Sequence, residues 1–167
     1  MENKILKHLS FNAEKGGLYF NEVRYLLIRP EVLVTFQKEI EQELGEKAQI
    51  ILFRSGFQGG MLSSKKFQAL YHFSDTETVH FMLEMGSQIG WGHFELERFD
   101  PVKRILSFKV YSSPFAEAYG SSKAPICHFI RGVMAGLAFF VFQKEVEAIE
   151  IECYAKGDPF CKFEIMW

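Results

Sequence analysis

The sequence predicts an α+β fold, an antiparallel sheet with helices packed on it. Segments with strand-like alternation lie at both ends of the chain, and segments whose apolar residues have helical spacing lie between them. Of the 167 residues, 48% are hydrophobic and 24% are charged, a balance typical of a chain that buries one sizeable core. We therefore expect one domain that spans residues 1–167.

The first 45 residues are expected to form paired strands and then a helix. Gly16-Gly17 is typical of a turn, and the apolar residues on either side of it, at 9–11 and 18–20, fit the two strands of a hairpin. Pro30 favours the first turn of a helix, and apolar residues keep helical spacing until Gly45 ends it.

Three further helices and two hairpins are expected in the rest of the chain. Ser74 and Glu77 have the spacing of a capping box, which fixes the start of the helix that follows them. Pro125 favours the first turn of the most apolar helix. The helices are expected at 46–60, 75–89 and 125–142, and the hairpin strands at 94–99 with 105–111 and at 146–154 with 160–165.

The charge pattern and the apolar runs argue against two classes of partner. The formal net charge is -2, and no cluster of Lys and Arg marks a phosphate-binding face, so direct nucleic-acid binding is not expected. The longest apolar run, 133–142, is too short to cross a bilayer, and the first residues lack the apolar core of a signal peptide. We expect a cytoplasmic protein that does not bind membranes.

Three cysteines and one glutamate are the candidate metal ligands. In a reducing compartment, three cysteines are better explained as thiols or metal ligands than as disulfides. Cys127 lies near the start of a predicted helix, and Glu150, Cys153 and Cys161 belong to one closing hairpin. Zinc takes four such ligands in a tetrahedron, and a site filled by protein ligands is structural. Since residues three apart point to opposite faces of a regular strand, Glu150 and Cys153 require a bulge or a strand end.

Other interpretations of these residues are open at the level of sequence. The cysteines could be small buried apolar residues, or Cys153 and Cys161 could form a bridge across the hairpin. No paired Cys-x-x-Cys motif is present to make zinc specific. His128 is the substitute ligand if Glu150 does not bind the metal.

Two parts of the chain resemble known protein families. The segment Glu150 to Phe163, with Cys127 and the Gly132-x-x-x-Gly136 pair before it, resembles the signature of the vinyl-4-reductase domain family of predicted hydrocarbon-binding proteins. Upstream, similarity to the amino-terminal part of the aromatic-sensing domain of phenol- and xylene-responsive bacterial activators is carried by Phe11-x-x-x-x-Gly16, Arg24 to Ile28, Leu44-Gly45 and Gly56 to Gly59. The sensor-like part covers residues 1–65 and the vinyl-4-reductase-like part residues 66–167.

The resemblance implies a zinc site beside an apolar pocket. In those sensors a Cys, Glu, Cys, Cys set binds zinc near an enclosed aromatic pocket, and its counterparts here are Cys127, Glu150, Cys153 and Cys161. The family also resembles subunits of the TRAPP trafficking complex, an α+β domain whose helices enclose a hydrophobic tunnel. We therefore expect zinc as the bound metal and an apolar small molecule as the ligand.

The pocket residues of those sensors are only partly matched. The sensors orient the phenolic hydroxyl with a His and a Trp, for which His80 and Tyr111 or Ser112 are the approximate counterparts. The aromatic residue that follows the first glycine of the helix is Val133 here, so we expect a changed pocket wall and a ligand other than phenol. His80, Trp91 and Tyr111 are candidates to orient the ligand, although packing explains each of them at least as well.

Three functions are compatible with these features. The leading hypothesis is a sensory or carrier domain that binds an apolar small molecule and passes its signal to a separate effector protein. The second is a vinyl reductase acting on a tetrapyrrole, against which stands the lack of a nucleotide-binding Gly-x-Gly-x-x-Gly motif. The third is a scaffold whose pocket only stabilises the fold. Under the first and third hypotheses we expect a homodimer.

Overall fold

The computed structural model describes residues 3–167 and confirms the predicted α+β class. These residues form two antiparallel sheets. The amino-terminal sheet has the strand order β1-β2-β3 and contains β1 (Leu9–Asn12), β2 (Gly17–Phe20) and β3 (Val23–Tyr25). The larger sheet has the order β4-β5-β7-β6 and contains β4 (His93–Asp100), β5 (Ile105–Tyr111), β6 (Glu147–Glu152) and β7 (Cys161–Met166). All three predicted hairpins are present.

Helices fill the rest of the described chain. The α-helices are α1 (Pro30–Leu44), α2 (Lys47–Tyr71), α3 (Asp75–Gln88), α4 (Pro114–Tyr119) and α5 (His128–Phe142). Two short 3-10 helices, η1 (Leu6–His8) and η2 (Tyr154–Lys156), precede β1 and follow β6. Within residues 3–167, no helix is long and apolar enough to cross a membrane.

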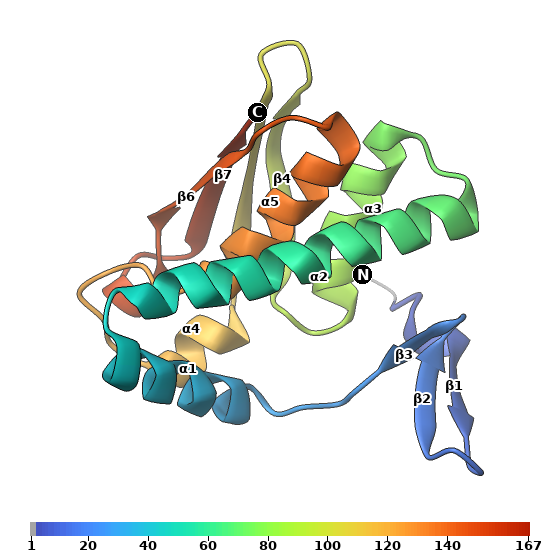
Figure 1. The fold of residues 1–167 in the computed structure, drawn as a ribbon, viewed down its shortest axis with the longest axis horizontal. Helices are drawn as coiled ribbons and strands as arrows, with labels where there is room; N and C mark the ends of the chain where they lie inside the picture. The colour runs from blue at the N-terminus through green and yellow to red at the C-terminus, as the bar shows by residue number, and fades with distance from the viewer. Residues whose placement is uncertain (1–2) are drawn as a thin grey trace.

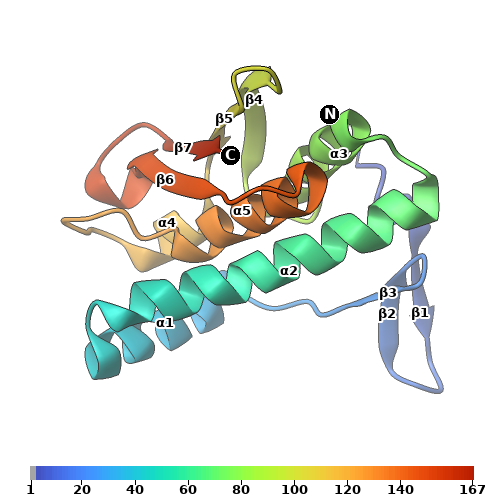
Figure 2. The same cartoon turned by 45° about the horizontal axis from the view of Figure 1, so that its top comes forward.

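The larger sheet, α5 and α2 form three successive layers (Figures 1 and 2). α3 and α5 lie on one face of this sheet, and α2 runs along the side of α5 that faces away from it. α1 and α4 lie beside the first half of α2, whereas the amino-terminal sheet lies near its other end. An extended segment connects β3 to α1 (Figure 1).

The face of the larger sheet that meets the helices forms the core. Alternate residues of the two central strands are buried there, namely Leu106, Phe108 and Val110 of β5 and Cys161, Phe163 and Ile165 of β7. Phe108 pairs with Phe163 across the strands, and their rings stack with centroids 4.9 Å apart. Because Cys161 has the same orientation as Phe163, its thiol points toward the helices rather than toward solvent.

α2 is longer than the sequence predicted, because its glycines serve helix packing instead of ending the helix. The predicted helix at 46–60 continues to Tyr71. A Cβ atom at Gly56 or Gly60 would overlap a carbonyl oxygen of α5, and one at Gly132 or Gly136 would overlap a carbonyl oxygen of α2. The backbones of α2 and α5 therefore touch, and side chains are excluded from the line of contact.

The start of α3 agrees with the prediction, and the start of α5 does not. Ser74 Oγ accepts a hydrogen bond from the N–H of Glu77, and the Glu77 carboxylate accepts one from the N–H of Ser74 at 2.8 Å, which completes the capping box. α5 begins at His128 rather than at Pro125. Cys127 is consequently the N-cap residue and not part of the first turn. The short helix α4 was not predicted.

Candidate metal centre and apolar cavity

The four candidate metal ligands converge between the start of α5 and the β6-β7 hairpin. The sulfurs of Cys127, Cys153 and Cys161 and a carboxylate oxygen of Glu150 all lie within 4.8 Å of one another. The three cysteines are buried free thiols, so the bridge between Cys153 and Cys161 is not formed. The sequence singled out these four residues, and the fold brings them together.

An irregularity in β6 lets Glu150 and Cys153 face the same point. The pairing of β6 with β7 shifts register between Glu150 and Glu152. β6 then ends at Glu152, immediately before Cys153. Both features that the sequence demanded of this segment, a bulge or a strand end, are therefore present.

The turn between β6 and β7 holds two of the thiols in place. The N–H of Cys153 donates to Asp158 Oδ2 at 2.8 Å, and the N–H of Tyr154 donates to Cys161 Sγ at 3.4 Å. Gly157 ends η2 with a φ of 99°, a left-handed conformation that favours glycine. A backbone amide that points at a cysteine sulfur stabilises the thiolate, which is the form that binds metals.

Glu150 connects the start of α5 to this hairpin. Its Oε2 accepts a hydrogen bond of 2.8 Å from the N–H of Cys127, one of the amides near a helix start that lack an intrahelical partner. Its Oε1 is buried and has no hydrogen-bond partner among the described residues. Leaving a buried carboxylate oxygen unpaired is costly, and a cation at the centre of the four groups would provide its missing partner.

The acidic groups of the cluster perturb one another. Burial, and then the neighbouring Cys153, raises the pKa of Glu150 to about 8. Hydrogen bonds with Cys153 and Cys161, and then burial, raise the pKa of the Cys127 thiol above its usual range. The pKa of Cys153 is lowered, chiefly because the other two thiols donate hydrogen bonds to its sulfur. Since several negative charges cannot accumulate here unaided, a cation would strongly favour the ionised forms.

The geometry fits a tetrahedral metal ion. The sulfurs of Cys127 and Cys161 are 3.7 Å apart, close to the ~3.8 Å that two thiolates have when they share a tetrahedral zinc at about 2.3 Å each. His128, the alternative ligand considered from the sequence, lies outside the converging group of four. It is buried, and this burial lowers its pKa to about 4. The described residues can therefore hold a metal ion in a closed site with four protein ligands.

An apolar cavity of about 150 Å³ lies between α2, α3 and α5. Its wall contains aromatic residues and methionines, among them Phe67, Trp91, Phe94, Phe129, Met82, Met85 and Met134. None of the described residues that line it carries a formal charge. An apolar cavity of about this volume accepts a single benzene ring. The cavity can therefore hold a small uncharged molecule.

Two of the four residues predicted to contact a ligand line this cavity. Trp91 and Val133 belong to its wall. His80 is exposed, and its ring makes an edge contact with Phe99 at 6.1 Å between centroids. Tyr111 is half-buried on β5, where it points away from the helices. His80 and Tyr111 thus lie outside the wall.

Two polar residues of the wall were missed by the sequence analysis. They are Tyr25 of β3 and Ser63 of α2. Burial raises the pKa of Tyr25 to about 12, so its hydroxyl stays protonated at neutral pH and can donate a hydrogen bond. Ser63 shares a helical face with Gly59 and would have been found if α2 had been extended beyond Gly60. No local pattern in the sequence connects Tyr25 with helices that follow much later.

Comparison with known protein families assigns both parts of the chain. Residues 4–100, more than half of the chain, match the family described as activator of aromatic catabolism. The chain belongs to this family of activators of aromatic catabolism. Residues 106–166 match the vinyl-4-reductase domain, in agreement with the resemblance of the carboxyl-terminal part.

Relatives of this activator-family chain include a bacterial regulator and an archaeal protein. Over 168 residues it is 26% identical to the phenol regulator MopR of Acinetobacter guillouiae, a match that covers 95% of this chain and 30% of MopR. Over 133 residues it is 28% identical to the uncharacterized protein MJ1460 of Methanocaldococcus jannaschii, covering 80% of this chain and 73% of that protein. The chain thus spans less than a third of the length of the phenol regulator.

Solved structures share the fold of this activator-family chain. The phenol-responsive sensory domain of the transcription activator PoxR, in a crystal structure with phenol, superposes with a TM-score of 0.85 at 21% identity, covering 97% of this chain and 86% of that one. A trafficking protein particle complex subunit 3 from Naegleria fowleri, covalently bound to palmitic acid, superposes with a TM-score of 0.61 at 15% identity over 82% and 93% of the two chains. Both support the predicted fold class.

Proposed function

We propose that this domain is a sensor that binds an uncharged aromatic small molecule in the cavity between α2, α3 and α5. The cavity itself carries the proposal, because it is walled by aromatic rings and methionines and its described lining residues are uncharged. Its volume of about 150 Å³ suits one aromatic ring. Acids and amines are disfavoured, since no opposite charge is available to pair with them inside an apolar wall.

Two similar proteins support an aromatic ligand. One is the phenol regulator MopR, and the other is the phenol-responsive sensory domain of PoxR. By analogy with a regulator, ligand binding here would alter the interaction of the domain with an effector, in another segment or in a separate protein. Tyr25, Ser63 and Trp91 provide the wall with hydrogen-bonding groups for one polar substituent.

We also propose that the four-ligand site binds zinc and that this zinc is structural. Three thiolates and a carboxylate suit zinc, and four protein ligands leave no position for a substrate. This closed set favours a binding domain over the vinyl reductase considered from the sequence. Because Cys127 caps α5, zinc would fasten that helix to the β6-β7 hairpin. α5 supplies Phe129, Val133 and Met134 to the cavity wall, so the metal would also stabilise the cavity.

Native mass spectrometry of the protein purified from cells tests both parts of the proposal. We expect a mass increment of one zinc ion and, in a fraction of molecules, that of a small organic molecule. A titration with toluene then tests the cavity directly, because Trp91 lies in the wall and its fluorescence should change on binding. Metal-free protein that keeps its native fold would contradict the zinc site, and an unchanged spectrum at saturating toluene would contradict the sensor.

We further propose that the domain forms a homodimer through its outer helices. Val32 and Phe36 are 55% and 63% exposed and lie four residues apart on one face of α1. Ile50 of α2, 52% exposed, adds to the apolar surface of these two helices. A second copy of the chain can bury such a face across a twofold axis. Sedimentation analysis should show a dimer that Phe36→Ser weakens; a monomer at all concentrations would contradict it.

A further inference from the structure

A second apolar space adjoins the cavity on the side of the amino-terminal sheet. It has a volume of about 290 Å³. Four residues, Tyr25, Ile89, Trp91 and Phe129, belong to the walls of both spaces. A shared set of side chains therefore forms the partition between them. We call the two spaces the inner cavity and the outer groove.

The two walls differ in chemistry. The inner cavity is rich in aromatic rings and methionines, which make favourable edge and sulfur contacts with an aromatic guest. The outer groove is mainly aliphatic and includes Ile5, Leu6, Leu9, Leu18, Leu26 and Leu33. None of the described residues that line the groove carries a formal charge. Such a wall suits a saturated chain and gives an ionic or strongly polar group no partner.

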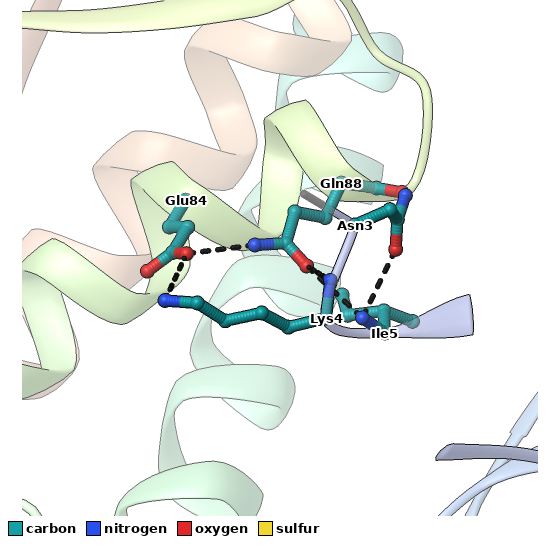
Figure 3. Close-up of polar contacts among 5 residues, drawn as sticks. All are labelled: Asn3, Lys4, Ile5, Glu84 and Gln88. Atoms are coloured by element: carbon teal, nitrogen blue, oxygen red, sulfur yellow. Dashed lines mark hydrogen bonds and ion pairs between the residues drawn. The ribbon is translucent and has the colours of Figure 1, made fainter. Parts of the chain in front are cut away.

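Hydrogen bonds to Gln88 fasten the amino-terminal segment that forms one side of the groove (Figure 3). Gln88 Oε1 accepts from the N–H groups of Lys4 and Ile5 at 2.8 Å and 3.0 Å, and its carbonyl oxygen accepts from Asn3 Nδ2 at 2.8 Å. Glu84 accepts from Gln88 Nε2 at 2.7 Å and forms an ion pair with Lys4 at 3.0 Å. Ile5 is thereby held, 7% exposed, as part of the groove wall.

We propose that the outer groove is a second ligand subsite, and that the ligand is an aromatic molecule with an alkyl chain. The ring occupies the inner cavity, and the chain passes between Tyr25, Trp91 and Phe129 into the groove. This inference rests on the proposed function, because it requires a ring in the inner cavity. The argument for this occupant is continuity: the groove shares its floor with the cavity and has an aliphatic, uncharged lining.

The length of the alkyl chain is the variable that tests the groove. Each methylene group that moves from water into an apolar site increases affinity about fourfold, which corresponds to about 0.8 kcal/mol. The inner cavity, with about 150 Å³, has room for little more than one ring. Any gain in affinity beyond the first carbon of the chain therefore has to come from the groove.

Affinities should be measured for toluene, n-propylbenzene, n-butylbenzene and n-hexylbenzene with the intact, metal-loaded chain. Trp91 fluorescence is the signal, and Trp167→Phe removes the other of the two tryptophans, which stacks on Phe142. We expect affinity to rise by about two- to fourfold per added methylene. Affinity that stays constant or falls from toluene to n-butylbenzene would overturn the inference while leaving the ring site intact.

Two leucine variants form a matched pair. Leu33→Gln places an amide in the groove wall, whereas Leu62→Gln makes the same change at a position on α2 that is 61% exposed. Leu33→Gln should reduce affinity for n-hexylbenzene at least tenfold and affinity for toluene less than twofold. Leu62→Gln should leave both unchanged. Equal losses for both ligands, or no loss in either, would overturn the groove assignment.

Gln88→Met tests the fastening of the amino-terminal segment with a side chain of similar size. It removes the acceptor for Lys4 and Ile5 and should loosen the groove wall. We expect it to lower affinity for n-hexylbenzene more than affinity for toluene. If Leu33→Gln instead changes only the sedimentation of the protein, the groove belongs to an interface between copies and the inference fails. If toluene does not bind either, the proposed function fails with it.

Discussion

The backbone of Gly60 in α2 lies directly against the carbonyl oxygen of Val133 in α5, with no room between them for a Cβ atom. This contact fixes the height at which α5 sits over the inner cavity. The Val133 side chain leaves the same residue toward the cavity wall. Helix packing and the shape of the proposed ligand site are therefore set by one residue of α5.

Gly60→Ala should destabilise the domain, and the adjacent Gly59→Ala should not. The added methyl group at Gly60 would meet backbone atoms, which forces α2 and α5 apart, and we expect a loss of about 2 kcal/mol. At Gly59 a Cβ atom would meet nothing within 4 Å, so the helix propensity of alanine should stabilise the protein by up to about 1 kcal/mol. Urea unfolding of the two variants provides the comparison. Equal effects would show that α2 and α5 are less tightly packed than described.

Cys153→Ser should remove both the metal and much of the stability. The free energy with which a structural zinc is bound is also free energy of folding, because the unfolded chain has no preformed site. We expect the variant to contain no zinc by elemental analysis and to lose about 4 kcal/mol or more, which is roughly 10 °C in the melting temperature of a chain of this size.

A chelator gives the control for this variant. EDTA should lower the melting temperature of the parent protein toward that of Cys153→Ser, and it should leave the variant itself unchanged. Ser122→Ala, away from the four ligands, should respond to EDTA as the parent does. A Cys153→Ser protein that melts like the parent, with or without chelator, would disprove a structural metal.

Local patterns predicted the hairpins and the capped start of α3, because the hydrogen bonds of a turn or cap are made within a few residues. The capping box of Ser74 and Glu77 is the clearest case. The end of α2 was wrong because Gly59-Gly60 has the composition of a helix end, whereas its role is contact with α5. Gly56 and Gly60, four apart, match the spacing of Gly132 and Gly136, and this repeated spacing was the available signal.

The candidate metal cluster could be found from the sequence because few residue types bind metals well. Three cysteines and Glu150 stood out by chemistry alone, and the register shift in β6 supplied the geometry that spacing required. The cavity was harder, because any apolar residue can line one. Tyr25 reaches the wall from a separate sheet, and only the three-dimensional arrangement of that sheet against α3 and α5 reveals it.

Glu97→Gln should weaken the outer face of the larger sheet in a pH-dependent way. The Glu97 carboxylate forms ion pairs with Lys162 at 2.7 Å and Lys109 at 3.1 Å and accepts from Ser107 at 2.7 Å. These contacts, with Lys162 first, lower its pKa from 4.5 to about 2. Because the pKa is lower in the folded chain, the stabilisation is present above about pH 4.5 and is lost as the pH falls toward 2.

The free energy of unfolding of the parent and of Glu97→Gln should be compared between pH 7 and pH 3. At pH 7 we expect a difference on the order of 1 kcal/mol, modest because the ion pairs are partly exposed. The difference should shrink below pH 4.5. Glu147→Gln, at an exposed position of β6, is the matched control and should change stability at pH 7 by less than about 0.5 kcal/mol. A difference for Glu97→Gln that is constant with pH would contradict the assignment of its low pKa.

Val133→Phe should block the inner cavity without unfolding the protein. The added ring can extend into the space of about 150 Å³, so overpacking should cost no more than about 1 kcal/mol. The backbone of Val133, which contacts Gly60, is unchanged by the substitution. Toluene affinity should fall at least tenfold, because the ring now occupies the volume that the ligand needs. Val133→Ala enlarges the same space, so it should retain toluene and accept larger rings, at a cost in stability of roughly 1 to 3 kcal/mol. If Val133→Phe binds toluene as tightly as the parent, the ligand lies elsewhere in the domain.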